Sequence, residues 1–465
     1  MVAPVQLEAL ILGCASSVVP STGEPWVYGW AFDDYRHSGR AVLPGRNGPV
    51  TLEPAAIDSL ETVVHRLQKE HPIRQRWDDA ELWGVVAAAI VELSELQQPE
   101  RAATELLRRL READPSLVVL VVANVTWQSA PVEIAGGVLG EHSQEFVDVV
   151  RTGSAGRESL DSEGGRDWLA SRLAADEESA PPVLAAYWTD GQRQLAIDNT
   201  ERWLQAVVDL ALLFEGDISG KDLWSLRGGH NRPGVRGTTM HRPAIEKLLA
   251  AHPDGHLDIA SEPYLATPTS GQVRSARWHS ADPVPLDAVL RDEAVFAIVH
   301  EAATGEQALY RRLRVAARWA AEAHWAIDSS DASLALGVAL DSLVGSRSGL
   351  PSRFMAQRFA LLEDEPSKRR ERVKRYNEVF AVRSAVAHGG ESSKATGAFV
   401  RSVAEDVRWA ARRLVSLHRT FNTPTETDVD ATFEALALGE LTWSLPSTEP
   451  AEVAPPVVGV PAHER

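Results

Sequence analysis

The feature that most constrains the fold is a helical pattern that fills much of the C-terminal third of the chain. From about residue 304 to 421, apolar residues recur at three- and four-residue spacing with only short polar breaks. This spacing places apolar side chains on one face of an α-helix. The pattern therefore predicts consecutive helices packed into an all-α bundle. The predicted helices span about 304–327, 330–344, 352–362, 366–388 and 396–421.

Several predicted helix ends carry a local signal. Thr304 and Gln307 have the T-x-x-Q spacing of a capping box. Ser330 or Asp331 is expected to cap the second helix. Pro366 suits the first turn of the fourth helix, where its missing N–H has no partner to lose.

The part of the chain before the bundle mixes two periods. Short apolar runs predict strands at 9–14, 25–32, 117–127, 131–140 and 182–188. Helical spacing predicts helices at 55–69, 79–97, 100–111 and 201–214. The stretch 152–180 is rich in Gly, Ser and acidic residues and is predicted to be a loop with one short helix.

These patterns predict an α+β protein, with a mixed N-terminal region followed by an all-α bundle. The expected organisation is an α+β domain at 1–215, a loop-rich connection at 216–303, a helical bundle at 304–445 and a disordered tail at 446–465. No P-loop, dinucleotide fingerprint, zinc spacing or G-x-S-x-G occurs in the first 300 residues. We therefore expect no metal and no cofactor, and assign this region a sensing or inhibitory role.

Charge and cysteine content limit the possible partners. The chain has 47 Lys and Arg against 65 Asp and Glu, a net charge of −18, so any nucleic-acid contact must be local. Its single cysteine, Cys14, suits a cytoplasmic protein. The sequence ILGCAS at 11–16 is similar to a lipoprotein cleavage box, but no Lys or Arg precedes it and Glu8 interrupts the apolar run. We expect a cytoplasmic location with no membrane partner, since no run of about 18 apolar residues occurs.

One local basic segment stands out against this acidic background. Residues 227–243 are rich in Gly, Pro and Asn, which predicts a loop, and contain no acidic residue. Its basic residues are Arg227, His230, Arg232, Arg236, His241 and Arg242. The segment is predicted either to contact RNA phosphates or to be an exposed, solvated loop tip.

The predicted helix at 366–388 carries an arginine on an apolar face. At 100° per residue, Val373, Tyr376, Val379, Phe380 and Arg383 share one side. A guanidinium group in such a position needs an anionic partner, because its desolvation is otherwise costly. That partner is either a protein carboxylate or a phosphate.

A second, polar stripe lies about 100° around the same helix. It contains Asn377, Ser384 and His388, and two glycines follow the histidine. Glycine commonly ends a helix in a left-handed turn, so His388 is placed at the negative end of the helix dipole, which favours the imidazolium. A histidine that exchanges a proton beside an arginine that holds phosphate is a minimal metal-free site for RNA cleavage. The same spacing is also typical of a capped, salt-bridged helix end.

The region from about 304 to 421 resembles the HEPN superfamily, in particular its Apea-like branch. Four stretches carry the resemblance: ALDSLV (339–344), RFMAQRFALL (353–362), SKRRERVKRY (367–376) and RSAVAHG (383–389). The resemblance implies a compact helical bundle that forms a homodimer, with two R-x4–6-H motifs facing each other across a cleft. It also implies a metal-independent endoribonuclease of the kind found in toxin–antitoxin and anti-phage systems, with an RNA substrate and a possible regulatory or antitoxin partner. Other members bind RNA or nucleotides without catalysis.

Carried over by position, the resemblance assigns roles to individual residues. Arg383 becomes the phosphate-binding arginine and His388 the catalytic histidine. Ser384 stands where many members have Asn, Asp or His. Tyr376, Asn377 and Asp341 are supporting residues, and Asp341 is placed to pair with Arg383.

A basic stretch precedes the motif. Residues 351–383 contain nine Lys or Arg against five acidic residues, a net charge of +4. Arg369, Arg370 and Lys374 are accordingly predicted RNA contacts, although internal ion pairing at a solvated helix start explains the pattern as well. Three hypotheses follow for the bundle: an RNA endonuclease, a catalytically silent binding module, or a helical dimerisation platform. The endonuclease requires Arg383 and His388 exposed to one cleft, and the platform requires Arg383 fully paired and shielded.

Overall fold

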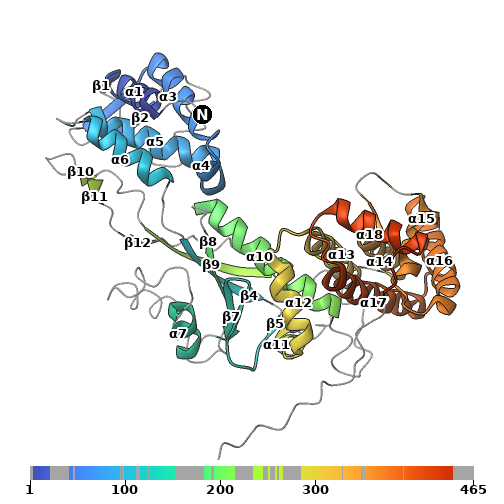
Figure 1. The fold of residues 1–465 in the computed structure, drawn as a ribbon. Coiled ribbons are helices and arrows are strands. Elements are labelled where there is room, and N and C mark those ends of the chain that lie inside the picture. The colour runs from blue at the N-terminus through green and yellow to red at the C-terminus, as the bar shows by residue number, and fades with distance from the viewer. Residues whose placement is uncertain are drawn as a thin grey trace, which may run out of the picture. The chain divides into compact units, whose positions relative to one another are not determined.

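The protein belongs to the mixed α+β class, with helices dominating. The computed structural model describes residues 4–20, 41–45, 48–94, 96, 99–111, 116–123, 125–141, 143–152, 183–189, 193–214, 234–243, 250–251, 257–258, 261–264, 284–326, 328–346, 349, 351–390 and 392–443. These residues form two compact units, of which the first ends at Thr304 and the second begins at Gly305 (Figure 1). The predicted strand at 25–32, the predicted loop at 152–180 apart from the helical Thr152, and the predicted tail at 446–465 lie outside the described residues.

The first unit begins with a helical layer and a small sheet. Its helices are α1 (Pro4–Ala15), α3 (Pro54–Leu67), α4 (His71–Arg76), α5 (Asp79–Ser94) and α6 (Pro99–Arg111). Strands β1 (Val18–Pro20), β2 (Ala41–Gly45) and β3 (Gly48–Leu52) form an antiparallel sheet with β3 in the centre. Buried side chains of these elements make one continuous hydrophobic cluster.

The strand predicted at residues 9–14 is wrong, because this segment belongs to helix α1. Leu7, Ile11 and Cys14 are buried in the cluster, at the spacing of one helix face. A short apolar run fits a buried strand and a buried helix equally well, so length decides between them. Here the helix extends to Pro4, beyond the run that suggested a strand.

A six-stranded antiparallel sheet is the main layer of the first unit. Its strand order is β12-β9-β4-β8-β7-β6. The strands are β4 (Ser116–Ala123), β6 (Val132–Ile134), β7 (Gly137–Glu141), β8 (Val183–Thr189), β9 (Gly234–Pro243) and β12 (Ser261–Tyr264). Helix α10 (Arg193–Phe214) packs on β4 and β8, and α7 (Gln144–Thr152) packs beside β7. Short elements complete the described part of this unit: β5 (Val125–Thr126), β10 (Ala250–Ala251), β11 (Leu257–Asp258), β13 (Val284–Pro285), α11 (Leu286–Leu290) and α12 (Glu293–Thr304).

The single strand predicted at 131–140 is only partly right, because the segment turns back on itself and forms two paired strands, β6 and β7. Ala135 and Gly136 form the two-residue turn, and both have positive φ, at 48° and 82°. This left-handed pair matches the twist of the two strands. The predicted strand at 182–188 and the predicted helices at 55–69, 79–97, 100–111 and 201–214 are also present, with shifted ends.

The loop prediction for 227–243 is wrong for residues 234–243, which form β9. This strand lies between β4 and β12 and pairs antiparallel with both. Arg236 and Arg242 belong to it. The register with β4 shifts between Val121 and Val122, and Arg236 is the extra residue of the bulge. Glycine and proline suggested a loop, but pairing on both edges determines the conformation. Arg227, His230 and Arg232 lie outside the described residues.

The second unit is helical throughout the residues that the structure describes. Its helices are α13 (Ala308–His324), α14 (Ser329–Val344), α15 (Ser352–Leu361), α16 (Arg369–Ala387), α17 (Gly397–Phe421) and α18 (Glu426–Leu438). A 3-10 turn, Pro366–Lys368, leads into α16. Helix α14 packs against α13, α16 and α17, so it forms the centre of the bundle (Figure 1). The five predicted helices are confirmed, and α18 was not predicted.

Two of the predicted helix starts are wrong. Thr304 ends α12, and Gln307 caps α13 without any side-chain hydrogen bond. Helix α14 is capped by Asp328, whose carboxylate accepts from the backbone N–H groups of Ser330 and Asp331 at 2.8 and 3.0 Å. Polar residues stand at several neighbouring positions here, and spacing alone does not distinguish a cap from the first turn. None of the described helices combines the length and the apolar composition that crossing a bilayer requires.

Candidate functional site

The candidate site is formed where α16 crosses the middle of α14. Asp341 of α14 receives two side chains from α16, one on each carboxylate oxygen. The Tyr376 hydroxyl donates to Oδ1 at 2.6 Å, and Nη1 of Arg383 lies 2.9 Å from Oδ2. The expected Arg383–Asp341 pair is therefore present, and Tyr376 completes it.

A glycine on α14 makes this approach possible. A Cβ atom built on Gly337 would lie 2.9 Å from Cβ of Arg383 and 3.0 Å from its Cγ, which is closer than carbon atoms pack. The stem of Arg383 thus lies directly on the backbone of α14. Gly337 is one helical turn before Asp341, so the stem leads the guanidinium group to the carboxylate. The guanidinium carbon also lies 5.8 Å from the ring centre of Phe380.

Burial and charge act in opposite directions on Asp341. Burial raises the pKa of this carboxyl group, whereas the hydrogen bond from Tyr376 and the charge of Arg383 lower it. Burial also raises the pKa of the Tyr376 phenol, and the neighbouring Asp341 charge adds to that rise. Tyr376 therefore stays protonated at neutral pH and acts only as a hydrogen-bond donor towards the carboxylate.

The guanidinium group of Arg383 is only partly satisfied. Its side chain is 29% exposed, and its Nε is buried without a hydrogen-bond partner. A guanidinium group has five N–H donors, and the recorded contact with Asp341 uses one nitrogen. This differs from the fully paired and shielded arginine that the dimerisation-platform hypothesis requires. Arg383 is held in place while part of its side chain is exposed, so a second anion would have to bind through N–H groups other than the buried Nε.

His388 lies at the end of α16, as predicted. Its backbone N–H donates to the Ser384 carbonyl at 3.2 Å, and its side chain is exposed. Gly389 has φ +76°, and the Gly390 N–H donates back to the Ala385 carbonyl at 3.0 Å. These bonds confirm the predicted left-handed glycine termination of the helix.

The structure brings three of the six predicted site residues into direct contact, namely Arg383, Tyr376 and Asp341. Asn377, Ser384 and His388 lie on the second stripe of α16, where Asn377 is exposed and Ser384 is half-buried. On an ideal helix, Arg383 and His388 are separated by about 7.5 Å along the axis.

The predicted basic surface is largely paired within the protein. Six of its nine basic residues contact a carboxylate or carbonyl group: Arg358, Lys368, Arg369, Arg372, Arg375 and Arg383. Two of these contacts are with α17, where Asp406 accepts a hydrogen bond from Arg375 at 2.6 Å and the Trp409 ring lies 3.8 Å from the Arg372 guanidinium carbon. Sequence reasoning did not identify these two residues. Of the predicted RNA contacts on this helix, Arg370 and Lys374 are exposed and Arg369 donates to a carbonyl.

Within the ranges that the structure describes, no three His, Cys, Asp or Glu side chains come together as metal ligands would. Comparisons of the chain with known protein families, curated proteins and solved structures give no match. The resemblance to HEPN proteins therefore rests on the sequence stretches quoted above.

Proposed function

We propose that the helical unit from Gly305 onward is a metal-independent endoribonuclease of the HEPN type, the class of enzyme found among toxins and anti-phage effectors. One observation carries the proposal. Arg383 is fixed by Asp341 and Gly337 yet remains 29% exposed, and an exposed histidine ends the same helix. Substrate RNA would bind with one phosphate on Arg383.

Each residue has a definite role in the proposed reaction. His388 takes the proton from the ribose 2′-hydroxyl, and the 2′-oxygen attacks the neighbouring phosphorus. Arg383 stabilises the negative charge that builds up on the phosphate oxygens. The bond from phosphorus to the 5′-oxygen breaks, and that oxygen takes up a proton. The products are a 2′,3′-cyclic phosphate and a 5′-hydroxyl.

Two copies of the chain suit this chemistry better than one. The reaction needs a base and an acid, and each chain offers one histidine at this position. In the proposed homodimer the second copy of His388 protonates the leaving 5′-oxygen. Light scattering of the full chain at micromolar concentration tests this arrangement. A monomer both with and without RNA contradicts it.

A catalytically silent module that binds RNA or nucleotides is the second candidate. Ser384 follows the arginine where many HEPN proteins carry Asn, Asp or His. In the described part of the chain, no side chain is recorded bonding to the His388 imidazole and orienting it. An imidazole without a fixed orientation is a less efficient proton acceptor in catalysis, whereas Arg383 is positioned for binding in either case.

The test is a cleavage assay on labelled single-stranded RNA, analysed on denaturing gels with and without EDTA. Wild-type protein is expected to cleave in EDTA. His388→Ala and Arg383→Ala are expected to abolish cleavage. His65→Ala removes an exposed histidine on α3 and Arg74→Ala an exposed arginine on α4, so both serve as matched controls that retain activity.

The ends of the products and the binding data separate the candidates. Cleavage by the proposed mechanism leaves 3′ ends that resist polyadenylation until the cyclic phosphate is removed. Cleavage that His388→Ala retains, or that EDTA abolishes, contradicts the mechanism. RNA binding without cleavage, lost in Arg383→Ala and retained in His388→Ala, identifies the silent binding module instead.

A further inference from the structure

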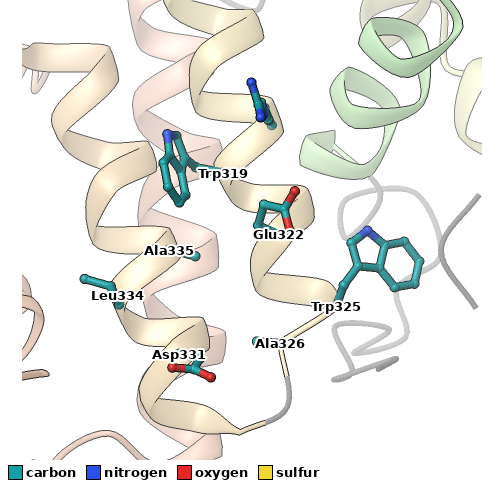
Figure 2. A pocket seen from close by; sticks show the side chains of 8 residues that line it. Trp319, Glu322, Trp325, Ala326, Asp331, Leu334 and Ala335 are labelled. Atoms are coloured by element: carbon teal, nitrogen blue, oxygen red, sulfur yellow. The ribbon is translucent and has the colours of Figure 1, made fainter. Parts of the chain in front are cut away.

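A second site lies between α13 and α14, in a pocket of about 430 Å³. The residues that determine its character are Arg318, Trp319, Glu322 and Trp325 from α13 and its C-terminal end, and Asp331 from the first turn of α14 (Figure 2). The reaction proposed above uses none of these residues. Its volume is at the lower end of the range of small-molecule sites, about 300–1,000 Å³.

Two tryptophans give the pocket its aromatic surface. Trp319 is 38% exposed, and it is the one tryptophan among the exposed large apolar side chains of the described residues. Figure 2 shows Trp319 and Trp325 on either side of Glu322. Exposing an indole ring to water is unfavourable, so a partner that covers Trp319 gains apolar contact.

The charges of the pocket select the chemistry of that partner. Glu322 and Asp331 contribute two carboxylates and Arg318 one guanidinium group, which gives the lining a net charge of −1. Both carboxylates would repel an anionic guest, and an uncharged guest would form no ion pair with them. An ammonium or guanidinium group gains from both features, because it pairs with carboxylates and is attracted to the face of an indole ring.

We propose that this pocket binds the cationic group of an organic amine or guanidine, over the indole of Trp319 and beside the carboxylates of Glu322 and Asp331. The cation belongs to a free polyamine or to an arginine or lysine side chain of a polypeptide. Both sources present the same chemistry to the pocket. The proposal does not depend on the nuclease function.

Isothermal titration calorimetry of the full chain tests the site in about 0.15 M salt, which screens the general attraction of cations to a chain of net charge −18. The probes are spermidine and N-acetyl-arginine amide. N-acetyl-citrulline amide is the uncharged analogue of the second probe, and adenosine tests whether the pocket instead stacks a neutral base. At least one cationic probe is expected to bind, with the citrulline compound at least about tenfold weaker.

Variants assign the binding to the pocket. Trp319→Ala and Glu322→Gln are each expected to weaken the cation at least about tenfold, and Trp319→Phe less than Trp319→Ala, because a smaller ring remains. Glu434→Gln removes an exposed carboxylate on α18 and is expected to leave binding unchanged. Far-UV circular dichroism verifies that each variant is folded.

Each outcome has a defined reading. Tighter binding of spermidine supports a free polyamine, and tighter binding of the arginine compound supports a polypeptide side chain. Three results overturn the proposal: neither cation binds at millimolar concentration, the citrulline compound binds equally well, or the cation binds unchanged to both Trp319→Ala and Glu322→Gln. Binding of adenosine without either cation overturns it as well. His388→Ala is expected to bind the cation normally, so a negative result in this experiment does not bear on the proposed nuclease function, and a negative cleavage assay does not bear on this pocket.

Discussion

Removing the Tyr376 hydroxyl tests how α14 and α16 are held together at the candidate site. Tyr376 is 1% exposed, and its hydroxyl donates to Asp341 at 2.6 Å. Its ring lies 5.9 Å from the ring of Phe359, measured between centres. Tyr376→Phe keeps this ring packing and removes only the donor. The change therefore isolates one hydrogen bond to a carboxylate.

The structure sets the expected size of the effect. A hydrogen bond to a charged group contributes about 1.5–3 kcal/mol. Asp341 is 18% exposed, so water partly replaces the lost donor and the lower end of this range applies. We expect Tyr376→Phe to lower the local free energy of unfolding by about 1.5 kcal/mol at pH 7, which increases the open population by roughly tenfold.

The pH dependence follows from the direction of the Asp341 pKa. Burial raises this pKa above its ordinary value of 3.8, so the folded state binds the proton more tightly than the unfolded state. The stability gained from this proton is fully present below pH 3.8 and is lost as the pH rises through the folded pKa. Without the Tyr376 bond the folded pKa rises further, so the loss continues to higher pH. The deficit of the variant is therefore largest near pH 7 and shrinks as the pH falls towards 4.

Hydrogen exchange followed by mass spectrometry measures the effect in the full chain. Peptides from α14 and α16 report the local opening, and rates at pH 7 and pH 5 are corrected for intrinsic exchange. A double-mutant cycle with Asp341→Asn isolates the contact. Because the carboxylate is absent in that background, Tyr376→Phe should lower the free energy of opening by less there than in the wild type. Protection that is unchanged at pH 7, or a deficit that grows as the pH falls from 7 to 5, refutes the reasoning.

Three further predictions concern other contacts. Gly337→Ala is expected to lower the free energy of unfolding by about 1–2 kcal/mol, because the new Cβ would lie 2.9 Å from that of Arg383, although alanine favours helices. Urea unfolding measures this change, and an increase in stability contradicts the prediction. Arg312→Met should lower the free energy of unfolding by about 3–5 kcal/mol in the same assay, because the guanidinium group, which is 6% exposed, pairs with Glu426. The loss should be smaller in a Glu426→Gln background, and an equal loss in both backgrounds argues against the pair. Burial raises the pKa of the Cys14 thiol to about 11, so labelling by a disulfide reagent at pH 8 should be at least about a hundredfold slower in the native protein than in urea, and equal rates would contradict this.

The sequence allowed good prediction of helices and poorer prediction of their ends. The helix at 366–388 was predicted almost residue for residue, because proline and glycine mark its limits. The caps at Gln307 and Asp328 were missed, since several polar residues stand close together. Strand β9 was missed for another reason: its partners β4 and β12 are distant in sequence, and local composition contains no information about such pairing.

The candidate site shows the same division. The pair of Arg383 and Asp341 was expected from the resemblance to HEPN proteins, and the two side chains are in contact. The role of Gly337 depends on which turn of α14 faces α16, which periodicity does not give to single-residue accuracy. The pocket around Trp319 was not predicted either, since its lining comes from two helices whose alignment only the packed bundle defines.

Residues of both proposed sites lie on helix α14. Asp331 of the pocket and Asp341 of the nuclease site are ten residues apart on it, about 15 Å along the axis. Gly337 lies between them, and the stem of Arg383 packs so close to it that a Cβ there would lie 2.9 Å from the arginine's own Cβ. Two ligands that favour different positions of one rigid rod are energetically coupled, and such coupling is reciprocal. Whatever factor a bound cation imposes on phosphate affinity, bound phosphate must impose on the affinity for the cation.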